Sequence, residues 1–124
     1  MLEQGALTEK IIGLAIAVHR ESGPGMLGSF YQTCLRHERD DAGIPFQTEV
    51  ILPAIYKGRS IPMGYRADIV VADAVVVEIK AVTAILPAHK AQLPTDLRMS
   101  HLKIGLLMNF HAKRLKDGIL RCVV

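Results

Sequence analysis

Two runs rich in apolar, β-branched residues lie close together in the middle of this chain and constrain its fold more than any other feature. The runs cover residues 65–71 and 75–80, and only the three residues Ala72, Asp73 and Ala74 separate them. Such runs are typical of strands, and the side chains of a strand alternate between its two faces. We therefore expect two strands joined by a short connection, each with one face distinct from the other.

The other elements are predicted from hydrophobic periodicity and from glycine and proline positions. Apolar residues repeat at three- and four-residue spacing near the start of the chain, which predicts helices over residues 8–21 and 27–42. The remaining predicted elements are a strand at 48–56 followed by a turn at 57–59, a helix at 88–100, and strands at 103–109 and 118–124. Pro53 lacks a ladder hydrogen-bond donor, so its strand is expected at a sheet edge or with a bulge.

The order of these elements, α-α-β-β-β-α-β-β, predicts a mixed α/β (α+β) fold with a central mixed β-sheet flanked by helices. The 124 residues are expected to form a single domain, 1–124. A composition of 50% hydrophobic and 22% charged residues excludes intrinsic disorder. The net charge of +3 permits contact with a polyanion without requiring one.

Composition also bears on location. No apolar run approaches the ~18 residues of a membrane span, so no membrane partner is expected. The first residues lack the basic and apolar regions of a signal peptide, and Cys34 and Cys122 stand apart from any metal-ligand spacing. We therefore expect a cytoplasmic protein with two unpaired thiols.

Charged residues interrupt the two central apolar runs. Asp68 is predicted to share a face with Arg66 and Val70. The opposite face is predicted to carry Tyr65, Ala67, Ile69 and Val71. Glu78 and Lys80 are predicted to share a face of the second strand, opposite its apolar row. If the two strands pair antiparallel, one register places Asp68 beside Glu78 and Lys80 while both apolar rows face the core.

Two carboxylates and a lysine at one place suit a hard divalent cation. Mg²⁺ prefers oxygen ligands and commonly uses one or two carboxylates together with phosphate oxygens and water. Such a metal can activate water against a phosphodiester, and Lys80 would offset the developing negative charge. The simpler alternative is a solvated strand face with ordinary ion pairs. The spacing alone leaves both interpretations open.

Seven short motifs follow one another along the chain. They are Gly-Pro-Gly (23–25) after Ala-Val-His-Arg (17–20), Tyr31, Gly-Tyr-Arg-Ala-Asp (64–68), Val-Glu-Ile-Lys (77–80), His-x-x-Gln (89–92), Asn-Phe (109–110) and Arg-Leu-Lys-Asp-Gly-Ile (114–119). Together they resemble the GxxExxY family, a small bacterial and archaeal branch of the PD-(D/E)XK nuclease-like superfamily. The resemblance covers about residues 7–123.

The resemblance implies a restriction-endonuclease-like core and a role for each matching residue. Asp68 and Glu78 resemble the two acidic metal ligands, and the backbone carbonyl of Ile79 often supplies another. Lys80 resembles the catalytic lysine, and Gln92 resembles a glutamine that orients the lysine or the substrate. The implied cofactor is Mg²⁺ or Mn²⁺, and the implied partner is nucleic acid, either DNA or RNA.

Three residues depart from the family pattern. Gly28 stands where the motif that names the family has a glutamate, and Asp96 stands where relatives commonly carry a tyrosine. Pro94 is expected to kink or delay its helix. These departures predict a nuclease-like domain whose cleavage activity is reduced or absent. They also leave open that the chain binds neither Mg²⁺ nor Mn²⁺.

Two further interpretations accompany this prediction. The alternative function is a catalytically inactive module that binds nucleic acid or another protein. A homodimer formed through the apolar first helix is compatible with either function.

Overall fold

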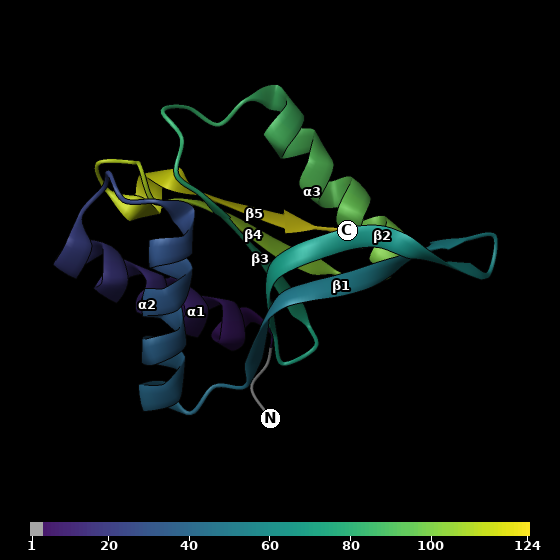
Figure 1. Cartoon of the computed structure of the whole chain (residues 1–124), viewed down its shortest axis with the longest axis horizontal. Helices are drawn as coiled ribbons and strands as arrows, with labels where there is room; N and C mark the ends of the chain where they lie inside the picture. Colours follow the sequence, from purple (N-terminus) through teal and green to yellow (C-terminus); the bar gives the residue numbers. More distant parts are fainter. Residues whose placement is uncertain (1–3) are drawn as a thin grey trace.

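The computed structural model of this chain describes residues 4–124, apart from the side chains of residues 4 and 63 (Figure 1). Its elements in order are α1 (Gln4–Ser22), α2 (Gly28–Ala42), β1 (Phe46–Tyr56), β2 (Arg59–Val71), β3 (Val75–Lys80), α3 (Pro87–Ser100), β4 (Ile104–Asn109), the 3₁₀ helix η1 (Leu115–Gly118) and β5 (Ile119–Val123). Every predicted helix and strand is present in the predicted order, and η1 is the one addition.

The five strands form one mixed sheet. Their spatial order is β1-β2-β3-β4-β5, and consecutive strands pair antiparallel except β3 and β4, which are parallel. A parallel pair needs a crossover, and α3 supplies it. The predicted mixed sheet flanked by helices is therefore confirmed.

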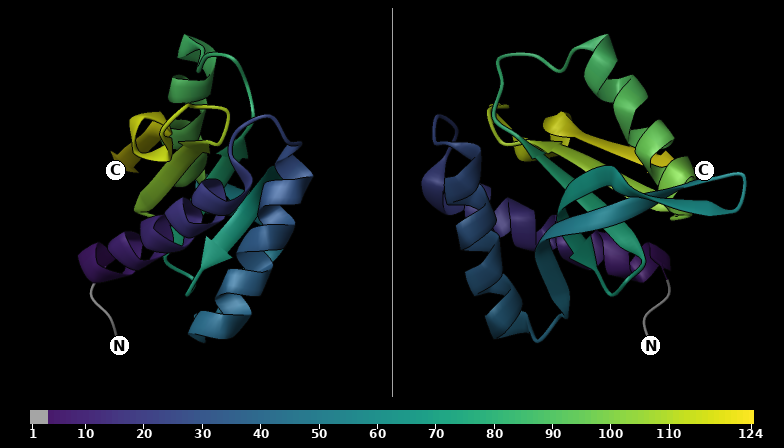
Figure 2. Two further views of the ribbon diagram at one scale, coloured as in Figure 1. Left: turned by 90° about the vertical axis from the view of Figure 1, so that its left-hand side faces the viewer. Right: turned by 45° about the vertical axis from the view of Figure 1, so that its right-hand side comes forward.

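Helices cover both faces of this sheet (Figure 2). Buried residues of α1 recur every three or four positions, at Leu7, Ile11, Ala15 and Val18, and pack with α2 against one face. Across the sheet, α3 packs a smaller apolar cluster that includes Leu93. The apolar stripe of α1 is thus buried within the chain, and the homodimer stays a prediction.

The hairpin of β1 and β2 extends beyond the rest of the sheet (Figure 1). Its turn at Lys57 and Gly58 has positive φ values of 48° and 78°, as a tight two-residue hairpin turn requires. Pro53 lies on the edge strand β1, where the register shifts between Leu52 and Ala54. Both expectations for Pro53, an edge and a bulge, are confirmed.

The faces of β2 differ from the prediction. Ile69 and Val71 pack on the α1/α2 face, whereas Ala67 packs on the α3 face, so the predicted row of these three residues is wrong. The cause lies opposite Asp68, where Glu49 has a left-handed φ of 54° and the regular pairing is interrupted. This twist turns the outer half of the hairpin over α3.

The length and composition of the helices bear on whether the chain can cross a membrane. Among residues 4–124, no helix combines the length and the apolar character that crossing a bilayer requires.

Candidate functional site

The candidate site lies where β2 and β3 separate. Regular pairing between the two strands runs from Val71–Val75 to Ile69–Val77. Beyond that point the Asp68 side chain, rather than a backbone carbonyl, joins the two strands: its Oδ2 accepts a hydrogen bond from the backbone N–H of Ile79 at 2.8 Å. A side chain thus occupies the place of a ladder carbonyl and holds Asp68 against the strand that carries Glu78 and Lys80.

Glu78 is the most strongly perturbed carboxyl group of the site. Its Oε1 accepts hydrogen bonds from the hydroxyl of Tyr65 and, at 3.4 Å, from the backbone N–H of Asp68. The pKa of Glu78 is raised from 4.5 to about 7, chiefly by burial; the Tyr65 hydrogen bond opposes this rise, and the neighbouring Asp68 carboxylate contributes to it. Burial also raises the pKa of Asp68 and, more strongly, the pKa of the Tyr65 hydroxyl.

Between the end of β3 and α3 lies a cavity of about 210 Å³, here called the α3-side cavity. Its polar lining residues are Glu78, Lys80, Gln92 and Asp96, with His89 at one side. The Nε2 of Gln92 donates to Oδ1 of Asp96 at 2.8 Å, and burial raises the pKa of Asp96. The structure therefore brings three of the four predicted catalytic residues to one cavity.

Asp68 faces a different cavity, of about 210 Å³, on the α2 side of the sheet. This α2-side cavity is lined by Gly28, Gln32, Glu49 and Asp68, together with Ile79. The buried Gln32 donates from Nε2 to the backbone carbonyl of Asp68 at 3.1 Å. Asp68 and Glu78 are thus neighbours across the gap between two strands, yet they line two cavities rather than the one that the sequence predicted.

Position 28 opens onto the same α2-side cavity. Gly28 is the first residue of α2 and so does not lie in the helix interior. A Cβ at this position would have only Ile79 Cγ2 within 4 Å, at 3.9 Å. A longer side chain at this position would therefore have space beside Asp68. Pro94 lies inside α3, which begins at Pro87, so this helix is not delayed, and the alternative of a kink at Pro94 stays a prediction.

Two residues of the site had no clear signal in the sequence. Tyr65 is half-buried, and its hydroxyl donates a hydrogen bond to Glu78. Glu49 raises the pKa of Asp68 and pairs with Arg66 at 3.0 Å. Glu49 reaches the site only because of its unusual backbone, which a one-residue pattern does not reveal.

The donor atoms at the gap are oxygens. Carboxylate and carbonyl oxygens suit Mg²⁺ and Mn²⁺, and burial raises the pKa of both Asp68 and Glu78. The residue types therefore fit such a metal. Among residues 4–124, no group of three or more His, Cys, Asp or Glu side chains is arranged to hold one.

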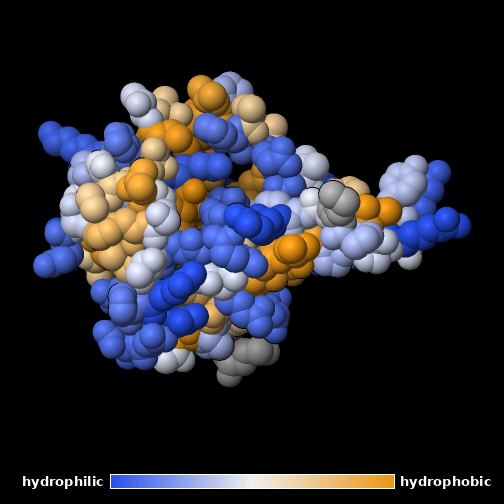
Figure 3. Space-filling view, in the orientation of Figure 1, coloured by the Kyte–Doolittle hydropathy of each residue, from blue (hydrophilic) through white to orange (hydrophobic). Residues whose placement is uncertain are grey.

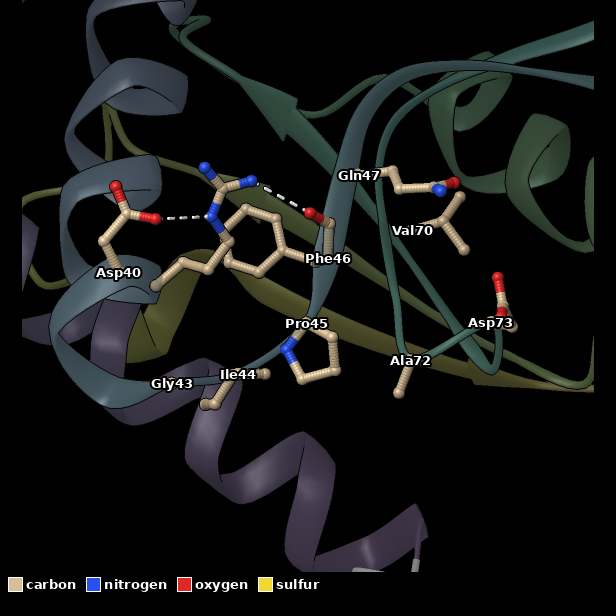
Figure 4. Close-up of a pocket in the computed structure, with 10 residues that line it drawn as sticks. Asp40, Gly43, Ile44, Pro45, Phe46, Gln47, Val70, Ala72 and Asp73 are labelled. Atoms are coloured by element: carbon tan, nitrogen blue, oxygen red, sulfur yellow. Dashed lines mark hydrogen bonds and ion pairs between the residues drawn. The ribbon is translucent and has the colours of Figure 1, made fainter.

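A larger cavity, of about 490 Å³, lies away from these residues, where α2 leads into β1 (Figure 4). Its one arginine, Arg39, is already engaged: Nη1 donates to the carbonyl of Phe46 at 2.9 Å and Nε contacts Asp40 at 3.1 Å. None of the predicted site residues lines this cavity, so its size alone does not make it the candidate site.

Comparisons with known proteins bear on the family of the chain. A family model described as the PD-(D/E)XK nuclease superfamily matches residues 5–122, which is nearly the whole chain. No curated protein and no solved structure matches the chain.

Proposed function

This chain belongs to the PD-(D/E)XK nuclease superfamily, and from that premise we propose that it hydrolyses phosphodiester bonds of DNA or RNA with Mg²⁺ or Mn²⁺. We further propose that Gly28 reduces or abolishes this activity. The observation that carries the proposal is the bond from Ile79 N–H to the Asp68 carboxylate, which holds Asp68 beside Glu78 where the strands part. The seven motifs support placing the chain in the GxxExxY branch, as a single domain over residues 1–124.

Each site residue has a proposed part in the reaction. Asp68, Glu78 and the carbonyl of Ile79 are the ligands for the metal, which when bound supplies a polarised water and positive charge beside the phosphate. Lys80 offsets the negative charge that develops on the phosphate, since it lines the α3-side cavity with Glu78. Gln92 orients Lys80 or the substrate, and its hydrogen bond to Asp96 fixes its amide.

The proposed loss of activity follows from the α2-side cavity. Gly28 brings no carboxylate there, although the backbone geometry leaves room for one beside Asp68. Metal affinity that depends on two protein carboxylates is then weaker than affinity that depends on three. The free cysteines Cys34 and Cys122 support a reducing compartment, and we propose the cytoplasm.

One observation favours a second candidate function, a non-catalytic nucleic-acid-binding or protein-interaction module. Asp68 lines one cavity, while Glu78 and Lys80 line another. If Asp68 and Glu78 do not bind one metal ion together, these residues have only a structural role in the sheet.

Cleavage assays distinguish the two functions. Single- and double-stranded DNA and RNA are incubated with Mg²⁺ or Mn²⁺ and with wild type, Lys80→Ala, Gly28→Glu or the control Lys103→Ala, which alters an exposed lysine at the opposite end of β4. We expect weak or no cleavage by wild type, a gain with Gly28→Glu, and a loss of at least ~100-fold in Lys80→Ala relative to the protein that keeps Lys80, as is typical when a group that stabilises transition-state charge is removed.

Two outcomes contradict the proposal. Cleavage that survives Lys80→Ala unchanged rejects the assigned catalytic lysine. Absence of cleavage by wild type and by Gly28→Glu, together with no calorimetric Mn²⁺ binding by either protein, supports the non-catalytic module instead.

A further inference from the structure

Another cavity, separate from the three already described, is lined by several basic residues. It measures about 420 Å³ and lies between the C-terminal end of α1 and η1. Four of its lining residues carry positive charge, Arg20, Lys113, Arg114 and Lys116, and no acidic residue lines it. We call it the basic cavity.

The positive charges of the basic cavity have no counterions within the described part of the chain. Ion pairs among residues 4–124 join Arg39 to Asp40 and Arg66 to Glu49, and none involves these four side chains, all of which are exposed. Like charges around one cavity repel one another, and a bound anion relieves this repulsion. The cavity therefore has the charge of an anion-binding site.

The walls of the basic cavity are held in place by buried contacts. Nε2 of the buried His19 lies 2.9 Å from the carbonyl oxygen of Ala112, which ties the end of α1 to the loop after β4. Phe110, which begins that loop, stacks on Tyr31 with ring centroids 4.4 Å apart, and the Tyr31 hydroxyl donates to the carbonyl of Gly23 at 2.7 Å. The end of α1, the start of α2 and the distant loop after β4 thus form one fixed frame.

The basic cavity lies at the same end of the sheet as Lys80. The backbone N–H of Phe110 donates to the carbonyl of Lys80 at 2.8 Å, so the loop that carries Lys113 and Arg114 starts directly beside the end of β3. In Figure 1 this loop, the loop after β3 and the loop between α1 and α2 gather together, and Figure 3 shows hydrophilic side chains projecting along that margin. One extended polyanion can contact both places.

We propose that the basic cavity binds a backbone phosphate of the nucleic-acid strand whose phosphodiester reaches the Lys80 site. The proposal rests on the proposed function in taking nucleic acid as the partner. Guanidinium and ammonium groups recognise phosphate oxygens through charge-assisted hydrogen bonds, and such contacts position a strand without reading its bases. Binding at this cavity is therefore independent of base sequence and sensitive to salt.

The test measures binding without cleavage. Fluorescence anisotropy of a labelled single-stranded oligonucleotide is followed in EDTA over a salt series, with wild type and the triple variant Lys113→Ala/Arg114→Ala/Lys116→Ala. We expect the triple variant to bind at least ~10-fold more weakly at low salt. Its slope of log affinity against log salt should be smaller by about 0.7, because one phosphate contact on a single strand is lost.

A control variant removes the same charge elsewhere. Lys10→Ala/Arg36→Ala/Lys103→Ala alters three exposed residues that line neither the basic cavity nor the two site cavities. We expect this variant to bind within about 3-fold of wild type with a nearly unchanged salt slope. Equal losses in both triple variants would overturn the proposal, since only net charge would then matter. Thermal melting verifies that all proteins are folded.

An inorganic phosphate arm distinguishes a nucleic-acid phosphate from a free one. Phosphate is titrated against the oligonucleotide complex at constant ionic strength. If the triple variant binds the oligonucleotide as tightly as wild type does, the proposal is overturned. If that variant has at the same time lost the binding of phosphate that wild type shows, the cavity is a site for free phosphate instead. Because these measurements need neither metal nor cleavage, their failure leaves the Lys80→Ala test of the proposed function untouched.

Discussion

The two faces of the sheet differ in what they bury. The α1/α2 face is a continuous apolar layer that includes Val77, Leu106 and Phe110, each no more than 1% exposed. The α3 face has a smaller apolar cluster, and beside it lie Glu78, Asp96 and Tyr65. One face therefore stabilises the fold, and the other gives up part of that stabilisation to keep ionisable groups out of water.

The cost of the second face is visible in the ionisation of its carboxyl groups. Burial raises the pKa of both Glu78 and Asp96, so each charged form is destabilised in the folded chain. Functional sites commonly carry such a cost, which replacement by neutral groups removes. The comparison therefore predicts opposite signs for substitutions on the two faces.

The largest effect is expected on the apolar face. Leu106→Ala removes a fully buried side chain and should lower the free energy of unfolding by about 2–5 kcal/mol in urea titrations. The control Leu120→Ala, on the neighbouring strand and 38% exposed, should change it by roughly 1 kcal/mol or less. Similar losses in the two variants would show that the α1/α2 layer is not the main source of stability.

On the α3 face the sign should reverse. The folded pKa of Glu78, about 7, lies above its ordinary value of 4.5, so the unfolded chain loses this proton first as the pH rises. The contribution of Glu78 to stability therefore falls between about pH 4.5 and 7 and then levels off. Glu78→Gln should abolish this fall and, in EDTA at pH 8, raise the free energy of unfolding by roughly 2–3 kcal/mol.

Urea titrations at pH 5 and pH 8 check this prediction. The control Glu21→Gln removes the same charge from an exposed position on α1 and should leave the pH dependence as in wild type. Destabilisation by Glu78→Gln at pH 8 would mean that the carboxylate is compensated in the fold.

A smaller effect is expected from Tyr65→Phe. The hydroxyl of Tyr65 stabilises the ionised form of Glu78, so its loss should raise the pKa of that carboxyl group further. Because a metal competes with the proton, the pH at which Mn²⁺ binding is half-maximal should move upward. The free energy of unfolding should fall by about 1 kcal/mol. Calorimetric Mn²⁺ titrations over pH measure the shift, with the exposed Tyr56→Phe as control, and an unchanged midpoint would separate Tyr65 from metal binding.

The smallest effect is expected at the surface. Arg66 and Glu49 pair at 3.0 Å, but their side chains are 67% and 41% exposed. Arg66→Ala should therefore lower the free energy of unfolding by about 0.5 kcal/mol or less, and less still at high salt. A loss well above 1 kcal/mol would show that this pair fixes the twist of the hairpin at Glu49.

The two central strands show how far the sequence predicts this site. On β3 the predicted alternation is correct, with Val75, Val77 and Ile79 on the α1/α2 face and Glu78 and Lys80 lining the α3-side cavity. Pairing with β4 along the whole of β3 keeps that strand regular. A period of two is therefore a reliable guide there.

On β2 the same rule fails at Asp68. The partner strand adopts a left-handed backbone at Glu49. Glutamate has no particular preference for this conformation, so the local sequence does not predict the twist. The residue types of the site were therefore predictable, whereas the division of Asp68 from Glu78 between two cavities depends on tertiary geometry.

The irregular hairpin also has a consequence for how the protein behaves in a crowded solution. The sheet ends in the free edge of β1, and such edges template aggregation when their donors and acceptors form an unbroken row. Pro53 removes a donor from that row, and the register shifts beside it, opposite Gly64, where a Cβ would overlap the backbone of Ala54. The bulge thus protects the chain against edge-to-edge polymerisation, and a substitution that straightened β1 would favour fibres.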